Sequence, residues 1–158
     1  MKDFSLFLRR WLPVGLWAGF MLYASTSVGS GDHTAHFFRP LLAWIWPDLR
    51  LASYPEINFF IRKTAHVIQF LLFTLLLWRA LRLPPPLALR TRDVLACAFG
   101  TSAVLAILSE GIQLFSPMRT AQIKDVWLDL LGSVIGVGLV FGIQMLRTRL
   151  RRRPSKAL

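Results

Sequence analysis

Residues 110–136 read EGIQLFSPMRTAQIKDVWLDLLGSVIG and contain the features that decide the fold. The stretch joins two apolar segments, Val94 to Phe115 and Val126 to Leu146, through a short polar connection. A helix that crosses a bilayer needs about 20 largely apolar residues, and both segments have that length. Each holds a single carboxylate, Glu110 in the first and Asp129 in the second. The stretch therefore predicts two adjacent membrane-spanning helices, each with one acidic side chain.

Two further segments of membrane-spanning length precede this pair. Trp11 to Gly31 carries no charge, and Thr64 to Leu83 has only Arg79 and Arg82, near its end. Long basic side chains at a helix end can extend to the membrane surface. The sequence therefore predicts an all-α fold, an integral membrane bundle of four transmembrane helices.

The first of these segments also has features of a cleaved signal peptide. Basic residues precede it, and the small residues Ala24 to Ser27 follow its apolar part. The charge-free run is long for a signal peptide, and no soluble domain follows it. We therefore expect a retained helix.

The segment between the first two predicted spans, Asp32 to Lys63, is rich in aromatic residues. Aromatic side chains suit the headgroup level of a membrane. We expect residues 35–46 to form a short helix at the membrane interface.

The chain is both apolar and basic. Hydrophobic residues make up 54% of it and charged residues only 17%, yet the formal net charge is +11. This composition rules out a disordered basic tail, which would be poor in large apolar residues. It also argues against a soluble nucleic-acid binder, whose basic residues would need a polar surface around them. We expect membrane lipid as the partner and no nucleic acid.

The distribution of charge predicts the orientation of the bundle. With the N-terminus in the cytoplasm and four crossings, thirteen of the 19 Lys and Arg residues are cytoplasmic, with only two of the eight acids. The remaining six basic and six acidic residues balance each other on the outer side. The positive-inside rule then places both termini in the cytoplasm, so we predict a multi-pass protein of the bacterial cytoplasmic membrane.

Three of the predicted helices carry polar side chains three or four residues apart, so that each pair shares a helix face: Lys63 and His66, Glu110 and Gln113, and Asp125 and Asp129. At about 1.5 Å per residue, all three pairs fall in the outer third of the bilayer. Ionisable groups within membrane helices usually face the bundle interior. We therefore expect one polar site that opens to the outside, with Arg119 as a further member.

Small residues four positions apart allow a neighbouring helix to approach closely. The last predicted span contains two such pairs, Gly132 with Gly136 and Gly138 with Gly142. We interpret both pairs as helix-packing positions.

The segments RKTAHVIQFLLF (residues 62–73) and 110–136 together resemble the VanZ-like family, small bacterial membrane proteins named for a teicoplanin-resistance protein. The family pattern is Lys-x-x-His, then Glu-x-x-Gln, Pro-x-Arg, an Asp and Gly-x-x-x-Gly. It is matched by Lys63, His66, Glu110, Gln113, Pro117, Arg119, Asp125, Gly132 and Gly136. The resemblance covers residues 10–146 as a single domain, and residues 147–158 form a basic cytoplasmic tail.

This chain departs from the family pattern at two positions. Asp129 stands where the family commonly has Asn, and Val67 stands where an aromatic residue is common. The resemblance implies a four-helix bacterial membrane protein of the cell envelope, linked in some members to glycopeptide resistance. It implies no established reaction.

The leading hypothesis is an enzyme that modifies a lipid headgroup or a lipid-linked glycan at the outer face. His66 would act as the general base, oriented by Glu110 or Asp125, so these three are the predicted catalytic residues. Phosphate would be held by basic side chains. The predicted substrate-binding residues are Lys63, Gln113, Arg119 and Asp129.

A non-catalytic binding or scaffold protein is the alternative. In that case the charged residues form structural ion pairs, such as Lys63 or Arg119 with Glu110 or Asp125. Transport is less favoured, because the inner parts of the helices are almost purely apolar, for example residues 71–77.

No cofactor and no metal site are predicted. His33 and His36 fit a solvated outer loop, and His66 with Glu110 and Asp125 lacks a strong ligand motif. The one cysteine, Cys97, cannot form an internal disulfide and is interpreted as a small packing residue.

Overall fold

The computed structural model describes residues 2–47, 53–82, 89–116 and 122–151. This part of the chain contains helices and turns and no strand, which confirms the all-α class. The elements are α1 (Lys2–Ala24), the 3-10 helix η1 (Ser27–Gly29), α2 (Gly31–Ile45), α3 (Tyr54–Leu81), α4 (Thr91–Leu114) and α5 (Ile123–Arg151).

Three helices, α3, α4 and α5, are long and apolar enough to cross a membrane. Their outward faces carry large apolar side chains that are more than half exposed, among them Leu108, Val134 and Phe141. Such surfaces are stable against lipid but not against water. The chain is therefore a multi-pass membrane protein. Cys97 is also exposed on α4, so its predicted packing role is wrong.

The first predicted span, residues 11–31, is interrupted in the structure. The helix α1 ends at Ala24, and the hydroxyl-bearing residues that follow cap two new elements. The Thr26 side chain accepts a hydrogen bond from the Val28 amide at the start of η1, and the Ser30 side chain accepts one from the His33 amide at the start of α2. Ser and Thr favour such capping positions because their hydroxyls bond local backbone groups.

The charge-free part of α1, residues 11–24, is about 21 Å long, shorter than the apolar core of a bilayer. It is not among the three candidate spans of the described helices. It nevertheless packs into the bundle: Val14 and Met21 are buried in the core beside Phe70 of α3, and Trp17 Nε1 donates a hydrogen bond to the Gln69 carbonyl at 3.0 Å.

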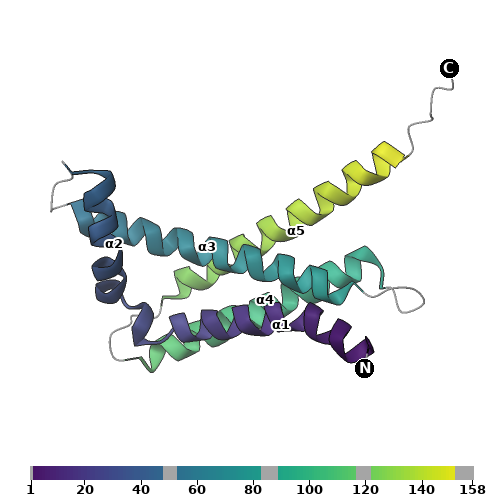
Figure 1. The fold of residues 1–158 in the computed structure, drawn as a ribbon, viewed down its shortest axis with the longest axis horizontal. Helices are drawn as coiled ribbons and strands as arrows, with labels where there is room; N and C mark the ends of the chain where they lie inside the picture. Colours follow the sequence, from purple (N-terminus) through teal and green to yellow (C-terminus); the bar gives the residue numbers. More distant parts are fainter. Residues whose placement is uncertain (1, 48–52, 83–88, 117–121, 152–158) are drawn as a thin grey trace, which may run out of the picture.

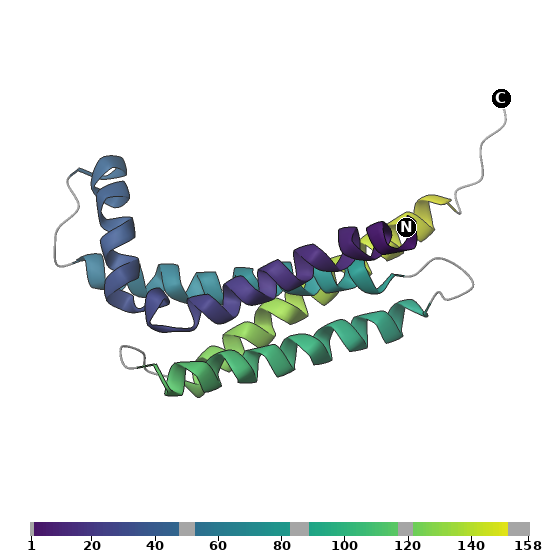
Figure 2. The same cartoon turned by 60° about the horizontal axis from the view of Figure 1, so that its bottom comes forward.

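The long helices lie along one axis, and each runs in the opposite direction to the one before it: α1, α3, α4 and α5. The helix α2 lies across that axis at one end (Figures 1 and 2). We call this the α2 end. It also contains the start of α3, the end of α4 and the start of α5. Residues 31–45 form a helix where a short one was predicted at 35–46, and its exposed face carries Phe37, Leu41 and Trp44.

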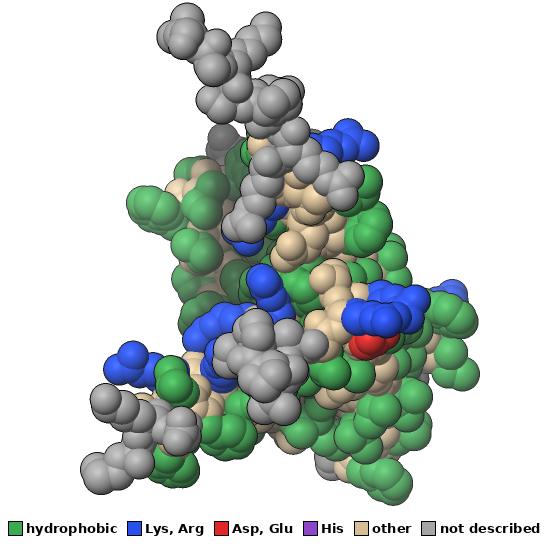
Figure 3. Space-filling view, turned by 90° about the vertical axis from the view of Figure 1, so that its right-hand side faces the viewer, with side chains coloured by type: hydrophobic (Ala, Val, Ile, Leu, Met, Phe, Trp, Pro, Cys, Tyr) green, Lys and Arg blue, Asp and Glu red, His purple; other side chains and the backbone are tan. Residues whose placement is uncertain are grey.

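The start of α1, the end of α3 and the start of α4 lie at the opposite end, and the end of α5 extends away from them there (Figure 1). Arginine side chains connect the first two, since Arg79 donates to the Arg9 carbonyl at 2.7 Å and Arg10 to the Arg82 carbonyl at 2.9 Å. Lys and Arg side chains gather on this basic end, with few acidic ones (Figure 3). The helix α5 continues to Arg151, so the first residues of the predicted tail are helical, and residues 152–158 lie outside the described part.

Candidate functional site

Two residues of α3 pair with two residues of α5, in two contacts one helical turn apart. The Lys63 ammonium contacts Asp125 Oδ1, and His66 Nδ1 lies 2.9 Å from Asp129 Oδ1. Asp125 is almost fully buried and Asp129 fully buried. Because α3 and α5 run in the same direction (Figure 1), the spacing of three residues on one helix matches the spacing of four on the other.

A close approach of the two backbones holds these contacts in place. A Cβ added at Gly132 would lie 2.2 Å from the Val67 carbonyl oxygen. Val67 directly follows His66, and Gly132 lies one turn after Asp129. Only a residue without a side chain therefore lets α5 come near enough for Asp129 to reach His66.

The two predicted glycine pairs behave differently. A Cβ at Gly136 would lie 3.1 Å from Thr74 Cβ, so Gly132 and Gly136 both line the α3–α5 contact as predicted. A Cβ at Gly138 or Gly142 would meet no described atom within 4 Å. The second pair therefore makes no close helix contact within the described part of this single chain.

Glu110 connects α4 to α5. Its Oε1 accepts a hydrogen bond from Gln113 Nε2 at 2.7 Å, and its Oε2 accepts one from the Gln122 backbone amide at 3.0 Å. Gln122 directly precedes α5, so this carboxylate satisfies one of the free amides near the start of a helix. The two bonds orient Glu110 toward the interior of the bundle.

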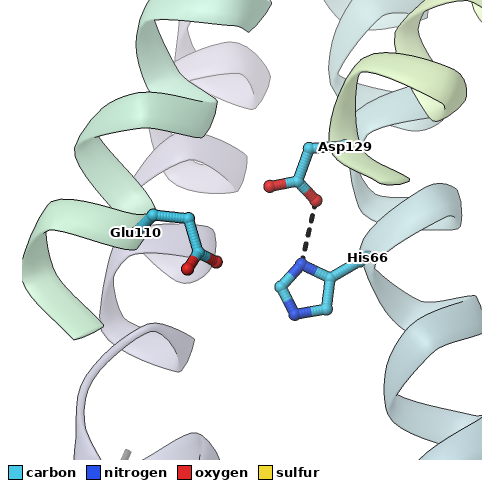
Figure 4. Close-up of side chains that lie close together, drawn as sticks. All are labelled: His66, Glu110 and Asp129. Atoms are coloured by element: carbon cyan, nitrogen blue, oxygen red, sulfur yellow. Dashed lines mark hydrogen bonds and ion pairs between the residues drawn. The ribbon is translucent and has the colours of Figure 1, made fainter. Parts of the chain in front are cut away.

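Three ligand-bearing side chains from three helices converge at this point. One atom each of His66, Glu110 and Asp129 lies within 4.8 Å of the other two. Figure 4 shows the two carboxylates and the imidazole facing a common space, with the dashed line marking the His66–Asp129 bond. We call these three side chains the carboxylate–histidine centre. Bringing two carboxylates close together in a buried site is unfavourable unless a proton or a cation offsets the repulsion.

Two buried oxygens of the site lack hydrogen-bond partners among the described residues: Asp129 Oδ2 and Gln113 Oε1. Both side chains are at most 1% exposed. Buried polar atoms in native proteins are nearly always paired, so this carboxylate oxygen is a candidate for binding a proton or a ligand.

A pocket of about 300 Å³ lies beside His66, between the end of α1, η1, α2 and the start of α3. We call it the His66 pocket. Its size is at the small end of the range for ligand sites. Its polar lining includes Arg62 and Gln69 as well as His66, and Arg62 forms no ion pair with any described residue. The remaining lining is Phe20, Met21, Ala24, Ser25, Gly29, Thr34, Phe38, Ile61 and Ala65.

The structure gathers the predicted site residues at the α2 end, but the partners of His66 differ from the prediction. Asp129, expected to bind substrate, contacts His66, whereas Asp125, expected to orient it, contacts Lys63. The Lys63–Asp125 contact is one of the ion pairs weighed as the structural alternative. Arg119 lies outside the described residues.

Three features of the site were missed in the sequence. On α3, Arg62 directly precedes Lys63, and Gln69 follows His66 by three residues. These spacings could have suggested both residues. The Gln122 amide could not be found from side-chain patterns, because the bond is made by the backbone. His33 is exposed, and its Nδ1 lies 3.1 Å from the Ser27 carbonyl, away from the centre.

The family model described as VanZ/LLP1 matches residues 10–146. No curated protein and no solved structure matches the chain.

Proposed function

Since this chain belongs to the VanZ/LLP1 family, we propose that it binds and modifies the phosphate-bearing headgroup of a membrane lipid or lipid-linked glycan in the bacterial cytoplasmic membrane. One observation carries this proposal. His66 forms part of the wall of the His66 pocket and is hydrogen-bonded to the buried Asp129. A substrate in the pocket would thus touch His66, which is itself part of the carboxylate–histidine centre.

The lining of the pocket suits the boundary between a headgroup and an acyl chain. Arg62 is available for a phosphate, and a guanidinium can hold two phosphate oxygens at once. Phe20, Phe38 and Ile61 provide an apolar wall on the same pocket. A ligand with one charged and one apolar end would satisfy both parts.

The position of α2 supports a pocket at the membrane surface. This helix lies across the bundle axis (Figure 2), and its exposed Phe37, Leu41 and Trp44 would enter the interface of the bilayer. The pocket lies between α2 and the transmembrane helix α3. A lipid headgroup could therefore reach it from the bilayer without leaving the surface.

The proposed reaction is hydrolysis at the headgroup phosphate. The oxygen of a water molecule forms a bond to phosphorus, and the bond from phosphorus to the alcohol group breaks. One proton of the water passes to the carboxylate–histidine centre, and the departing alkoxide takes up a proton from it. The products are the free alcohol and a phosphate that carries the hydroxyl group derived from the water.

Replacing His66 with Ala is expected to lower lipid modification by at least about 100-fold, the smaller end of what a positioned acid–base group contributes. The protein should still insert, because His66 is not part of the hydrophobic core. The measurement is a comparison of lipid species in cells that produce the wild type, His66→Ala or no protein. His36→Ala is the matched control, since His36 is an exposed histidine of α2. Full activity of His66→Ala would refute the proposal.

A scaffold or binding protein without catalysis is the second candidate. It is favoured by the Lys63–Asp125 ion pair and by the bridge from Glu110 to the start of α5, both of which hold helices together. Lipid species that stay unchanged whether or not the protein is present would support this candidate over the enzyme. Glycopeptide resistance that cells keep when they produce His66→Ala in place of the wild type would support it as well.

The proposed orientation places the basic end in the cytoplasm and the His66 pocket on the outer side. The test is labelling of single cysteines with a maleimide that cannot cross membranes, in a Cys97→Ser background. We expect Glu56→Cys to be labelled in intact cells and Arg92→Cys only after the membrane is opened, because these exposed residues lie at opposite ends. The reverse pattern would show that the topology is inverted.

A further inference from the structure

We propose that the carboxylate–histidine centre binds one divalent transition-metal ion, with Zn²⁺ the ion that fits best. His66, Glu110 and Asp129 would each supply one ligand atom. The inference deepens the proposed function: the role of the ion in the reaction rests on that function, whereas its binding rests on geometry alone.

The spacing of the three ligands is close to that of a zinc site. With Zn–N and Zn–O bonds of about 2.0–2.2 Å, the ligand atoms of a tetrahedral zinc lie about 3.4 Å apart. Here one ligand atom from each of the three side chains lies within 4.8 Å of the other two. The ion would take the place of the proton in the His66–Asp129 hydrogen bond, whose Nδ1–Oδ1 distance is 2.9 Å. Small side-chain rotations would bring all three onto one ion.

A second, independent observation points to a ligand at this place. Asp129 Oδ2 is fully buried and has no hydrogen-bond partner among the described residues. In Figure 4 this second oxygen points toward Glu110, into the space between the two carboxylates. A bound cation would pair this oxygen and offset the repulsion between the two acids.

The surroundings of the ligands also resemble those of a metal site. Metal-binding carboxylates are commonly held by further hydrogen bonds that fix their orientation. Glu110 accepts such bonds from Gln113 Nε2 and the Gln122 backbone amide. These bonds would hold the carboxylate in place before the ion arrives.

The type of donor selects the ion. Calcium and magnesium prefer six or more oxygen ligands, whereas an imidazole suits zinc and other transition metals. Three protein ligands leave one position of a tetrahedral zinc open, as in catalytic zinc sites. A water or a phosphate oxygen could take that position. His66 would then act as a ligand and not as the general base, because the ion itself lowers the pKa of a bound water.

The test is zinc content of the full-length protein, purified in detergent, loaded with Zn²⁺, and separated from free metal by gel filtration. We expect about one Zn²⁺ per chain in the wild type and a loss of at least tenfold in His66→Ala, Glu110→Gln and Asp129→Ala. The controls are His36→Ala and Asp93→Asn, which remove an exposed histidine and an exposed carboxylate outside the centre. Both should keep the full content.

A thermal-shift experiment covers the case in which a variant does not fold. Added Zn²⁺ should raise the Tm of the metal-free wild type with rising zinc concentration, because an ion that binds only the folded state stabilises it. His36→Ala should show the same rise. Wild-type protein with neither bound zinc nor a shift in Tm would overturn the proposal.

The lipid measurements separate this proposal from the proposed function. Bound zinc with unchanged lipid species in the cell would leave the metal site standing and refute the enzyme. A lipid change that requires His66 in a protein without zinc would refute the metal site and restore His66 as the general base.

Discussion

Gly132→Ala is expected to prevent the normal packing of α5 against α3. The added Cβ would lie 2.2 Å from the carbonyl oxygen and 3.0 Å from the carbonyl carbon of Val67. Both atoms belong to the backbone of a long helix, so no side-chain rotation can relieve the clash. Overpacking a core usually costs about 1–3 kcal/mol, and we expect this substitution to reach about 3 kcal/mol because a whole helix must move.

The measurement is the Tm and the monodisperse fraction of the protein in detergent. Gly138→Ala is the matched control on the same helix, since a Cβ there meets no described atom within 4 Å. Alanine is the better helix former by about 1 kcal/mol, so the control should be as stable as the wild type or more so. Gly136→Ala should lie between them, because its closest contact is a side-chain atom at 3.1 Å. Equal Tm values for Gly132→Ala and Gly138→Ala would contradict the close packing.

The same substitution should also damage the site. Moving α5 away from α3 separates Asp129 from His66, whose contact is 2.9 Å. Gly132→Ala should therefore lose zinc as well as stability, whereas Gly138→Ala should keep both. This links the packing of two helices to the geometry of the carboxylate–histidine centre.

Asp125→Ala is expected to destabilise the protein by about 2–3 kcal/mol. The substitution leaves the Lys63 ammonium without its partner in a site where the Asp125 side chain is only 4% exposed. Removing one partner of a buried ion pair costs about 3–5 kcal/mol, and the partial exposure of Lys63 reduces this figure. Thermal unfolding in detergent measures the loss.

A double-mutant cycle isolates the ion pair. The double variant Lys63→Met with Asp125→Leu should be more stable than either single variant, because it leaves no unpaired charge. Asp93→Ala is the matched control, since the Arg92–Asp93 pair is at the surface, with side chains 75% and 49% exposed. Its effect should stay within about 1 kcal/mol. Additive effects of the two single substitutions would show that Lys63 and Asp125 do not stabilise each other.

Several parts of the fold follow from local sequence features. Long apolar runs predicted α3, α4 and α5, since a bilayer-spanning helix is recognised by length and composition alone. The end of α1 was missed because the prediction rested on the length of the apolar run and its lack of charge. The hydroxyl-bearing residues 25–27 were the signal for the break, since such side chains compete for backbone hydrogen bonds.

The candidate site was predicted as a group but not in its detailed contacts. Helical spacing and equal depth were enough to place Lys63, His66, Glu110 and Asp129 at one end of the bundle. They could not decide whether His66 meets Asp125 or Asp129, because the two aspartates lie one turn apart on the same face. That choice depends on how far α5 is shifted along α3, which no local pattern reveals.

The sequence by itself determined that this chain is helical, spans a membrane and carries its polar residues on three helices at one depth, because these properties depend on residue type and spacing. Only the tertiary structure decided which side chains meet. The contact of Gly132 with the Val67 backbone sets the register of α5 on α3. That register joins Asp129 to His66 and Asp125 to Lys63. With Glu110 from α4, it forms the carboxylate–histidine centre. The packing of these helices leaves Asp129 Oδ2 buried and without a hydrogen-bond partner in the part of the chain that the structure describes.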